Sequence, residues 1–146
     1  EVLPVARVEE RVAAREEAEK DNPGGPDVNR RRMVDALQQL SIELDFLDNR
    51  QTCTVTGNNG LFDCPENTEF FLGNAGTAIR PLTAALSLVD GDFIIDGDKY
   101  MRERPIAHLT DALKELGAGI TFLMKEGYPP FQIQGGKVKS RIDSPL

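Results

Sequence analysis

The chain has 146 residues, of which 40% are hydrophobic and 28% are charged, a composition typical of a globular protein with its own core. The formal net charge of -7 argues against sequence-independent nucleic-acid binding, which depends on cations that displace counterions from phosphates. Two cysteines without a CxxC spacing and a single histidine support neither a disulfide framework nor a zinc site, and the apolar runs are far shorter than a membrane span. We therefore expect a soluble protein with free thiols and no metal.

The first 27 residues differ from the rest of the chain. The segment VEERVAAREEAEK carries opposite charges at helical spacing, and DNPGGPD ends that pattern with glycine and proline. We expect residues 1–27 to form a charged helical tail and a linker. A helix that binds a partner is the alternative for this segment.

An apolar stripe marks the start of the folded part, at residues 28–57. Met33, Ala36, Leu37 and Leu40 recur at the spacing of one helix face, which predicts a helix from Val28 onwards. The segments IELDF and TCTVTG then alternate apolar and polar residues on either side of LDNRQ. This alternation predicts a β-hairpin.

Residues 70–134 predict a second series of strands and helices. The expected elements are a buried strand at 70–72, a helix at about 75–88, a strand at 93–95, a helix at about 103–116, and a hairpin formed by ITFLM and FQIQ. In the second helix, Ile106, Leu109, Leu113 and Leu116 should share the buried side. Gly117 stands where a left-handed C-terminal cap belongs.

The chain also contains an internal repeat. MVDALQQL…DFL aligns with LTDALKEL…TFL at a constant offset, which pairs Asp35 with Asp111 and Leu40 with Leu116. The repeat predicts an α/β (α+β) fold with one complete βαβαββ unit at 69–136. Residues 28–57 would be the αββ back half of another unit, within a partial domain covering 28–146.

The segment FFLGNAGTAIRPL combines a strand, a glycine-rich turn and a helix start. Such an arrangement suits an anion, because unpaired amides of the first helical turn point outward and the helix dipole favours negative charge. Gly73 and Gly76 allow close approach of a ligand, Asn74 can donate from its amide, and Thr77 can cap the helix or bind the anion. Arg80 either reaches back to the anion or pairs with a carboxylate. Glycine turns before helices are also common as purely structural features.

A basic cluster, Lys99, Arg102 and Arg104, precedes Pro105 in KYMRERPIAHL. Cations before a helix oppose its dipole, so they indicate a bound anion or nearby carboxylates, with Glu103 as the candidate partner. Arg104, which Pro105 restrains, is best placed to bind a carboxylate or phosphate through its guanidinium fork.

Two long stretches, FFLGNAGTAIRPLTAAL and MRERPIAHLTDALKELGA, resemble the signature stretches of the 5-enolpyruvylshikimate-3-phosphate (EPSP) synthase family. The resemblance covers about residues 28–137 and includes ALQQL, TGNNG and YPPFQIQGG. It implies repeated βαβαββ units in the inside-out barrel of the enolpyruvyl transferases, with an active site between two domains. It also implies transfer of the enolpyruvyl group of phosphoenolpyruvate to shikimate 3-phosphate in aromatic amino acid biosynthesis. No metal or organic cofactor is implied, and the location is cytoplasmic, or plastid if the chain comes from a plant.

The resemblance also assigns ligand contacts. It implies that Gly76 lies against phosphoenolpyruvate, where an added methyl group would crowd this substrate or the herbicide glyphosate that mimics it. The substrate-binding set that it implies is Asn74, Gly76, Thr77 and Arg104. The supporting set is Arg80, Pro81 and Glu103.

Several departures from the family pattern predict a fragment that is inactive alone and has no catalytic residue of its own. Residues 1–27 lack the early Lys-and-Ser/Asn-Arg motif, SRIDSPL stands where a Ser-Ser-Gln stretch would follow GGKVK, and the second domain that completes the site is missing. Tyr100 stands where Arg is usual, and the chain begins at Glu1 rather than Met. The alternative is a non-catalytic anion-binding or structural module of the same fold. UDP-N-acetylglucosamine enolpyruvyl transferase is a weaker match, because no cysteine lies between Arg80 and Arg104.

Overall fold

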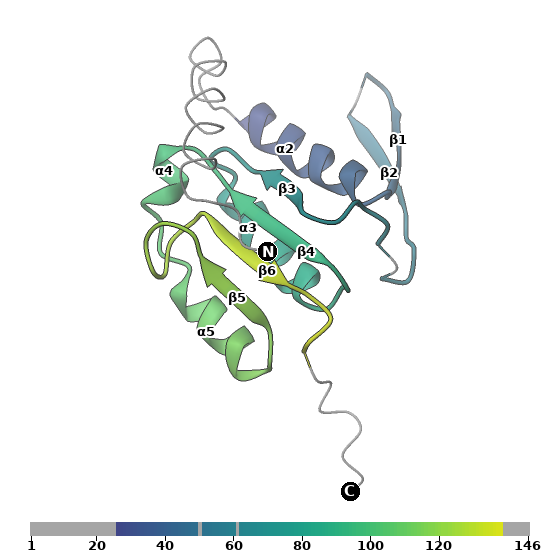
Figure 1. Cartoon of the computed structure of the whole chain (residues 1–146). Helices are drawn as coiled ribbons and strands as arrows, with labels where there is room; N and C mark the ends of the chain where they lie inside the picture. Colours follow the sequence, from purple (N-terminus) through teal and green to yellow (C-terminus); the bar gives the residue numbers. More distant parts are fainter. Residues whose placement is uncertain (1–25, 50, 61, 139–146) are drawn as a thin grey trace, which may run out of the picture.

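The computed structural model describes residues 26–49, 51–60 and 62–138 (Figure 1). The tail and linker predicted at 1–27 lie outside the described residues, except for Pro26 and Asp27, which belong to α2, and the segment SRIDSPL lies outside them as well. The elements in chain order are α2 (Pro26–Gln39), β1 (Glu43–Leu47), β2 (Thr52–Thr56), β3 (Thr68–Phe71), α3 (Gly76–Ser87), β4 (Asp92–Asp96), α4 (Lys99–Arg102), α5 (Ala107–Glu115), β5 (Gly119–Phe122) and β6 (Phe131–Gln134). None of the helices described is long and apolar enough to cross a lipid bilayer.

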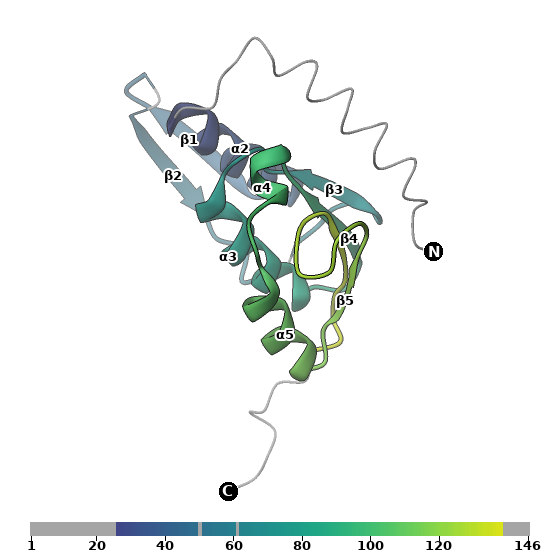
Figure 2. The ribbon, with the colours of Figure 1, turned by 90° about the vertical axis from the view of Figure 1, so that its left-hand side faces the viewer.

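The strands form two sheets. β1 and β2 pair as the antiparallel hairpin that the sequence predicts, and β3, β4, β6 and β5 form a second sheet in that order. In this four-stranded sheet β3 runs parallel to β4, whereas β6 is antiparallel to both of its neighbours. Helices α3 and α5 lie on the same face of the sheet, as the side view shows (Figure 2).

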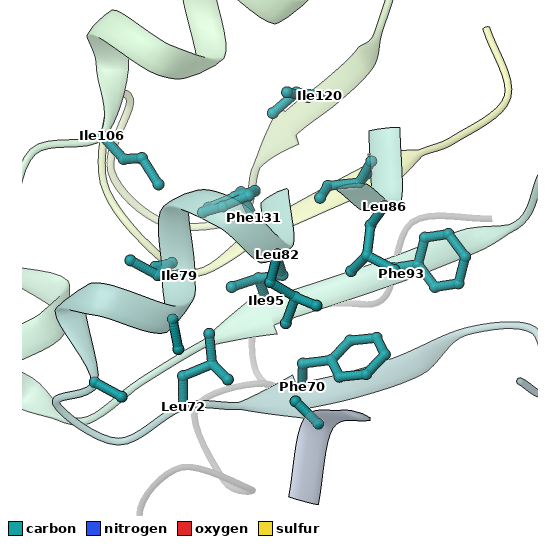
Figure 3. Packing of buried hydrophobic residues seen from close by; sticks show 14 of the residues in the cluster. Phe70, Leu72, Ile79, Leu82, Leu86, Phe93, Ile95, Ile106, Ile120 and Phe131 are labelled. Carbon is teal, nitrogen blue, oxygen red and sulfur yellow. The ribbon is translucent and has the colours of Figure 1, made fainter. Parts of the chain in front are cut away.

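The core lies between α3 and this sheet face. Alternation along each strand directs every second side chain toward the helix, so large apolar residues from three neighbouring strands meet there (Figure 3). The strands contribute Phe70, Phe93, Ile95, Phe131 and Ile133, and α3 contributes Ala78, Ile79, Leu82 and Leu86. Leu86, Phe70 and Ile95 are fully buried. The mixed α/β architecture predicted from the sequence is therefore observed.

The prediction of one continuous helix at 103–116 is wrong. Asp98 caps the short helix α4 by accepting a hydrogen bond from the Met101 N–H at 2.9 Å, and the chain leaves this helix after Arg102. Pro105 has no N–H and disfavours helical geometry for the residue before it, so the next helix starts only at Ala107. The basic cluster therefore lies on a short helix and the loop that follows it.

The end of α5 also differs from the prediction in one respect. Leu116 is 47% exposed, whereas the fully buried Thr110 takes a place on the core side of the helix. Gly117 does adopt the predicted left-handed conformation, with φ of 102°, and its N–H donates to the Lys114 carbonyl. At the other end of the chain, α2 starts at Pro26, two residues before the predicted start at Val28.

Two leucines near the end of α3 provide a test of this core. Leu86→Ala removes a fully buried side chain and should lower the free energy of unfolding by about 2 to 5 kcal/mol. Leu88→Ala, at a position 66% exposed, should change it by less than about 0.5 kcal/mol. Urea unfolding followed by circular dichroism measures both values. Equal losses in the two variants would contradict the described packing.

Candidate anion-binding site

The glycine turn joins β3 to α3 through a left-handed residue. Gly73 has φ of 52°, a conformation that costs a residue with a Cβ more than it costs glycine. The turn is closed by the Ala75 N–H, which donates to the Leu72 carbonyl at 2.9 Å, and by the Gly76 N–H, which donates to the Asn74 carbonyl at 2.9 Å. The chain can thus reverse direction at once after the strand and start α3 at Gly76.

The start of α3 has no side-chain cap. The N-cap residue is Ala75, so Thr77 does not cap the helix, which was one of the two roles predicted for it, and the Thr77 side chain is exposed. Among the described residues, the Thr77 N–H also has no backbone acceptor. The first turn of a helix with such free amides attracts negative charge.

Asn74 adds an unsatisfied polar atom to this turn. Its Oδ1 is buried and accepts no hydrogen bond from the described residues. Most buried polar atoms in folded proteins have a partner, so an unpaired one at a turn calls for an explanation such as a bound molecule. Oδ1 accepts hydrogen bonds, so its partner must be a donor, and only the side-chain NH₂ group of Asn74 can donate to an anion.

Arg104 lies directly against the turn. A Cβ built on Gly76 would stand 2.6 Å from the Arg104 Nη1 atom, closer than real carbon contacts permit. The two residues line a cavity of about 10 Å³ with Met101 and Ile106, which is room for about one water molecule. Glycine at position 76 is thus what allows the guanidinium to approach the start of α3.

Arg80 connects the helix to the loop of Arg104. Its Nη2 donates to the Pro105 carbonyl at 3.4 Å, so its partner among the described residues is a backbone carbonyl and not a carboxylate. Pro81 lies inside α3, and because it has no N–H, the Thr77 carbonyl loses its usual helical donor. Arg80 lines the cavity beside Gly76 and Arg104, and Pro81 follows it within α3.

The partner of Arg102 is Asp96, and the prediction that Glu103 pairs with the basic cluster is wrong. Arg102 donates from Nε to the Asp96 Oδ1 at 3.0 Å and from Nη2 to Oδ2 at 2.7 Å, a bidentate pair, whereas Glu103 is exposed. Asp96 is fully buried and was missed in the sequence. The sequence does contain a signal for this pair. Asp96 ends the apolar strand FIID just before a glycine, and Arg102 follows it six residues later.

Lys99 is also engaged, because its Nζ lies 5.0 Å from the centre of the Tyr100 ring. Of the predicted basic cluster, Arg104 is thus the member whose guanidinium lies against the glycine turn and has no carboxylate partner among the described residues. The structure brings Gly76 and Arg104 together and directs Arg102 elsewhere.

The two cysteines lie in different surroundings, since Cys53 is exposed and Cys64 is partly buried. Both are free, and burial raises the pKa of the Cys64 thiol, with the charge of Asp63 acting in the same direction and a hydrogen bond with Thr68 opposing it. A raised pKa disfavours the nucleophilic thiolate. Within the described residues, no group of three or more His, Cys, Asp or Glu side chains is placed to hold a metal ion.

A larger groove, of about 810 Å³, lies between α2 and the β1–β2 hairpin. Arg30, Arg31 and Asp35 line it from the helix, and Phe46 and Cys53 line it from the hairpin. None of the residues predicted to bind phosphoenolpyruvate lines this groove. Volume alone therefore does not identify the site.

The family model for EPSP synthase (3-phosphoshikimate 1-carboxyvinyltransferase) matches residues 15–144. The chain belongs to the EPSP synthase family. The resemblance expected from the two signature stretches is therefore confirmed.

Curated relatives in this family cover the same region. A 3-phosphoshikimate 1-carboxyvinyltransferase of Sulfurovum sp. is 50% identical over 119 residues, which is 80% of this chain and 28% of the relative. The enzyme of that name from Pectobacterium carotovorum is 49% identical over 73% of this chain and 25% of its own length. The chain thus spans about a quarter of the length of these relatives.

Solved structures of the family share the fold. An EPSP synthase from Acinetobacter baumannii matches with a TM-score of 0.65 and 25% identity, over 73% of this chain and 24% of that one. Another structure of the enzyme from this organism, at 22% identity, has a TM-score of 0.64 over 79% of this chain and 31% of that one, a likeness of fold. The fold described above is therefore that of part of an EPSP synthase.

Two glycines near the site should respond differently to an added methyl group. In Gly76→Ala the Cβ meets the movable end of the Arg104 side chain, so the guanidinium shifts and the free energy of unfolding changes by less than about 1 kcal/mol. In Gly97→Ala the Cβ meets the Gly73 carbonyl and the Met101 Cβ, both held in the fold, and should cost more than about 2 kcal/mol.

Chemical denaturation and the NMR signal of the Arg104 Nε–H group measure these two effects. A Gly76→Ala variant with an unmoved Arg104 signal would contradict the close contact. A Gly97→Ala variant as stable as the wild-type protein would contradict the packing of the two loops.

Proposed function

We propose that the glycine turn and Arg104 form part of the phosphoenolpyruvate site of an EPSP synthase. The enzyme would transfer the enolpyruvyl group of phosphoenolpyruvate to shikimate 3-phosphate in the synthesis of aromatic amino acids. The observation that carries this proposal is the approach of Arg104 Nη1 to the backbone of Gly76, where a Cβ would stand 2.6 Å away. A guanidinium and a free helix N-terminus then face the same small space.

This arrangement suits the chemistry of phosphoenolpyruvate, which carries a phosphate and a carboxylate. Arg104 would bind one of these groups through its guanidinium, and the amides at the start of α3 would bind near the other. Asn74 and Thr77 would complete the wall, the first by donating from its side-chain NH₂ group and the second from an N–H that has no backbone acceptor among the described residues. No cofactor takes part in this binding.

The supporting residues act on the walls of the site. Arg80 would hold the loop of Arg104 through the Pro105 carbonyl, and Pro81 would shape the helix above the turn. Glu103 is exposed next to Arg104, where its carboxylate would limit the local positive charge. These three roles are weaker than direct contact with the substrate.

The element order supports the proposed domain organisation. The series β3, α3, β4, α5, β5 and β6 matches a βαβαββ unit at 69–136, and α2, β1 and β2 match an αββ half unit at 28–57. We assign both to a partial domain of the inside-out barrel of enolpyruvyl transferases, predicted at 28–146, in which α2 begins two residues earlier, at Pro26. The complete domain would supply the front half of the first unit.

The chemistry needs more than this binding site. Protonation at C3 of phosphoenolpyruvate and attack of the 5-hydroxyl of shikimate 3-phosphate on C2, with loss of the hydroxyl proton, form a tetrahedral intermediate. Loss of a proton from its C3 methyl group and of phosphate from C2 then gives the enolpyruvyl ether. Both substrates must be held in reacting geometry, and acid and base groups must be placed beside them. We therefore propose that a second domain completes the site and that this chain binds substrate without turnover.

The relatives named above are bacterial. We therefore propose a cytoplasmic location for this protein rather than a plastid one.

A non-catalytic structural module is the alternative. One observation favours it, because the cavity between Gly76 and Arg104 holds about one water molecule, much less than phosphoenolpyruvate. Phosphoenolpyruvate could enter this space only if the exposed Arg104 side chain moved away from the glycine turn. The two functions differ in whether the chain has any affinity for phosphoenolpyruvate.

Titration of this chain with phosphoenolpyruvate, followed by amide NMR shifts, tests the proposal. We expect saturable shifts at the glycine turn and at Arg104, with a Kd in the millimolar range. Arg104→Ala removes a charge-assisted hydrogen bond and should weaken binding by about tenfold or more. Gly76→Ala should weaken it as well, because the methyl group occupies the space of the ligand.

Lys137→Ala is the matched control, since it removes an exposed positive charge outside the turn and should leave the affinity within about twofold. Equal effects of Lys137→Ala and Arg104→Ala would show a non-specific response to net charge. A folded wild-type chain without saturable shifts would support the structural module instead.

A further inference from the structure

Asp96 lies at the end of β4, and both of its carboxylate oxygens accept hydrogen bonds. The Arg102 fork donates to Oδ1 and Oδ2, and the Gly97 N–H donates to Oδ1 at 2.7 Å. The side chain of Asp96 is fully buried, and that of Arg102 is 17% exposed. A charged pair this well shielded has strong directional preference, because water does not compete for its hydrogen bonds.

The backbone around Asp96 is tied to the glycine turn. The Leu72 N–H donates to the Asp96 carbonyl at 2.9 Å, and the Asp98 N–H donates to the Gly73 carbonyl at 3.1 Å. Gly97 packs so closely that an added Cβ would overlap the Gly73 carbonyl. Asp96 is therefore the last residue of β4, and the segment that follows it packs directly against the glycine turn.

The same segment leads to Arg104 through α4. Asp98 caps this helix, the Arg102 N–H donates to the Asp98 carbonyl at 3.0 Å, and the Arg104 N–H donates to the Met101 carbonyl at 3.0 Å. Met101 is 1% exposed and anchors the inner side of the helix. Since α4 is only four residues long, its own hydrogen bonds cannot fix its direction.

We propose that Asp96 is a positioning residue for phosphoenolpyruvate binding, which acts by holding Arg102 and thereby sets Arg104 against Gly76. The inference rests on the function proposed above and adds a residue to it. The carboxylate holds α4 from its last residue, and Asp98 holds it from its first. With both ends of α4 fixed, the loop after Arg102 leaves the helix in a single direction. Arg104, whose guanidinium faces the glycine turn, is the second residue of this loop.

The charge of Asp96 is what this role needs. Asp96→Asn keeps the shape of the side chain but replaces one acceptor by an NH₂ group, which cannot receive the second hydrogen bond of the Arg102 fork. Arg102 is partly exposed, so it can turn to solvent, and α4 loses its second anchor without exposing the core. Arg102→Lys keeps the charge and loses the fork, and should give a smaller effect of the same kind.

Isotope-labelled wild-type chain and its variants give the test in two readouts. Without ligand, the Gly76 amide and Arg104 Nε–H signals should move in Asp96→Asn and, less, in Arg102→Lys. With phosphoenolpyruvate, the Kd of Asp96→Asn should rise by about tenfold. Glu126→Gln is the matched control, because it breaks the exposed Lys114–Glu126 pair, at 3.4 Å, and should change neither readout.

A double variant separates positioning from general weakening of the fold. If Asp96 acts through Arg104, then Asp96→Asn should raise the Kd of an Arg104→Lys background by less than about twofold, although it raises that of the wild-type chain by about tenfold. A full tenfold effect in both backgrounds would overturn the proposal. So would unmoved Gly76 and Arg104 signals in a folded Asp96→Asn chain.

Two further outcomes are an Asp96→Asn variant that does not fold and a wild-type chain that does not bind phosphoenolpyruvate. If Asp96→Asn does not fold, Arg102→Lys replaces it in the same comparisons, with the same criteria. If the wild-type chain binds no phosphoenolpyruvate, the function proposed above fails, and the ligand-free signals still decide whether Asp96 positions Arg104.

Discussion

One buried ion pair, between Asp96 and Arg102, connects the parts of the structure that face the candidate site. The carboxylate is fully buried and receives three hydrogen bonds, two from the guanidinium and one from the Gly97 amide. Removing one partner of such a pair typically costs about 3 to 5 kcal/mol, because the other charge stays buried alone. The partial exposure of Arg102 reduces that cost here, since its guanidinium has a route to water. The pair is therefore better understood as a constraint on geometry than as a source of stability.

Most of the fold could be predicted from the sequence, because its elements follow simple periodic patterns. The apolar stripe that contains Ala36 and Leu40 predicted α2, and the alternation in IELDF and TCTVTG predicted the β1–β2 hairpin. The helix predicted across Pro105 was wrong, since the pattern of Leu109 and Leu113 was extended backwards over a residue that breaks helices. Capping by Asp98 is a local signal that marks the short helix before this break.

The composition of the candidate site could be predicted, but its connections could not. Gly76 and Arg104 were both named from their types and local context, while their contact depends on how β4 and α4 follow the turn. The partner of Arg102 was assigned to its neighbour in sequence, Glu103, whereas the observed partner ends a strand six residues earlier. Pairing across a turn of the backbone is a tertiary property, and periodicity carries no information about it. The ligand-binding roles of Gly76, Arg104, Asn74 and Thr77 all remain predictions.

The glycine turn and the loop after β4 are joined by hydrogen bonds in both directions, and we infer that they open and close as one unit. Native-state hydrogen exchange of the Leu72 and Asp98 amides measures this directly, because each donates to a carbonyl of the other segment. We expect both amides to exchange with the opening free energy of core amides in β4, through global unfolding. Rapid exchange of Asp98 through local opening, with Leu72 still protected, would show that the loop of Arg104 moves independently of the turn and would contradict the account.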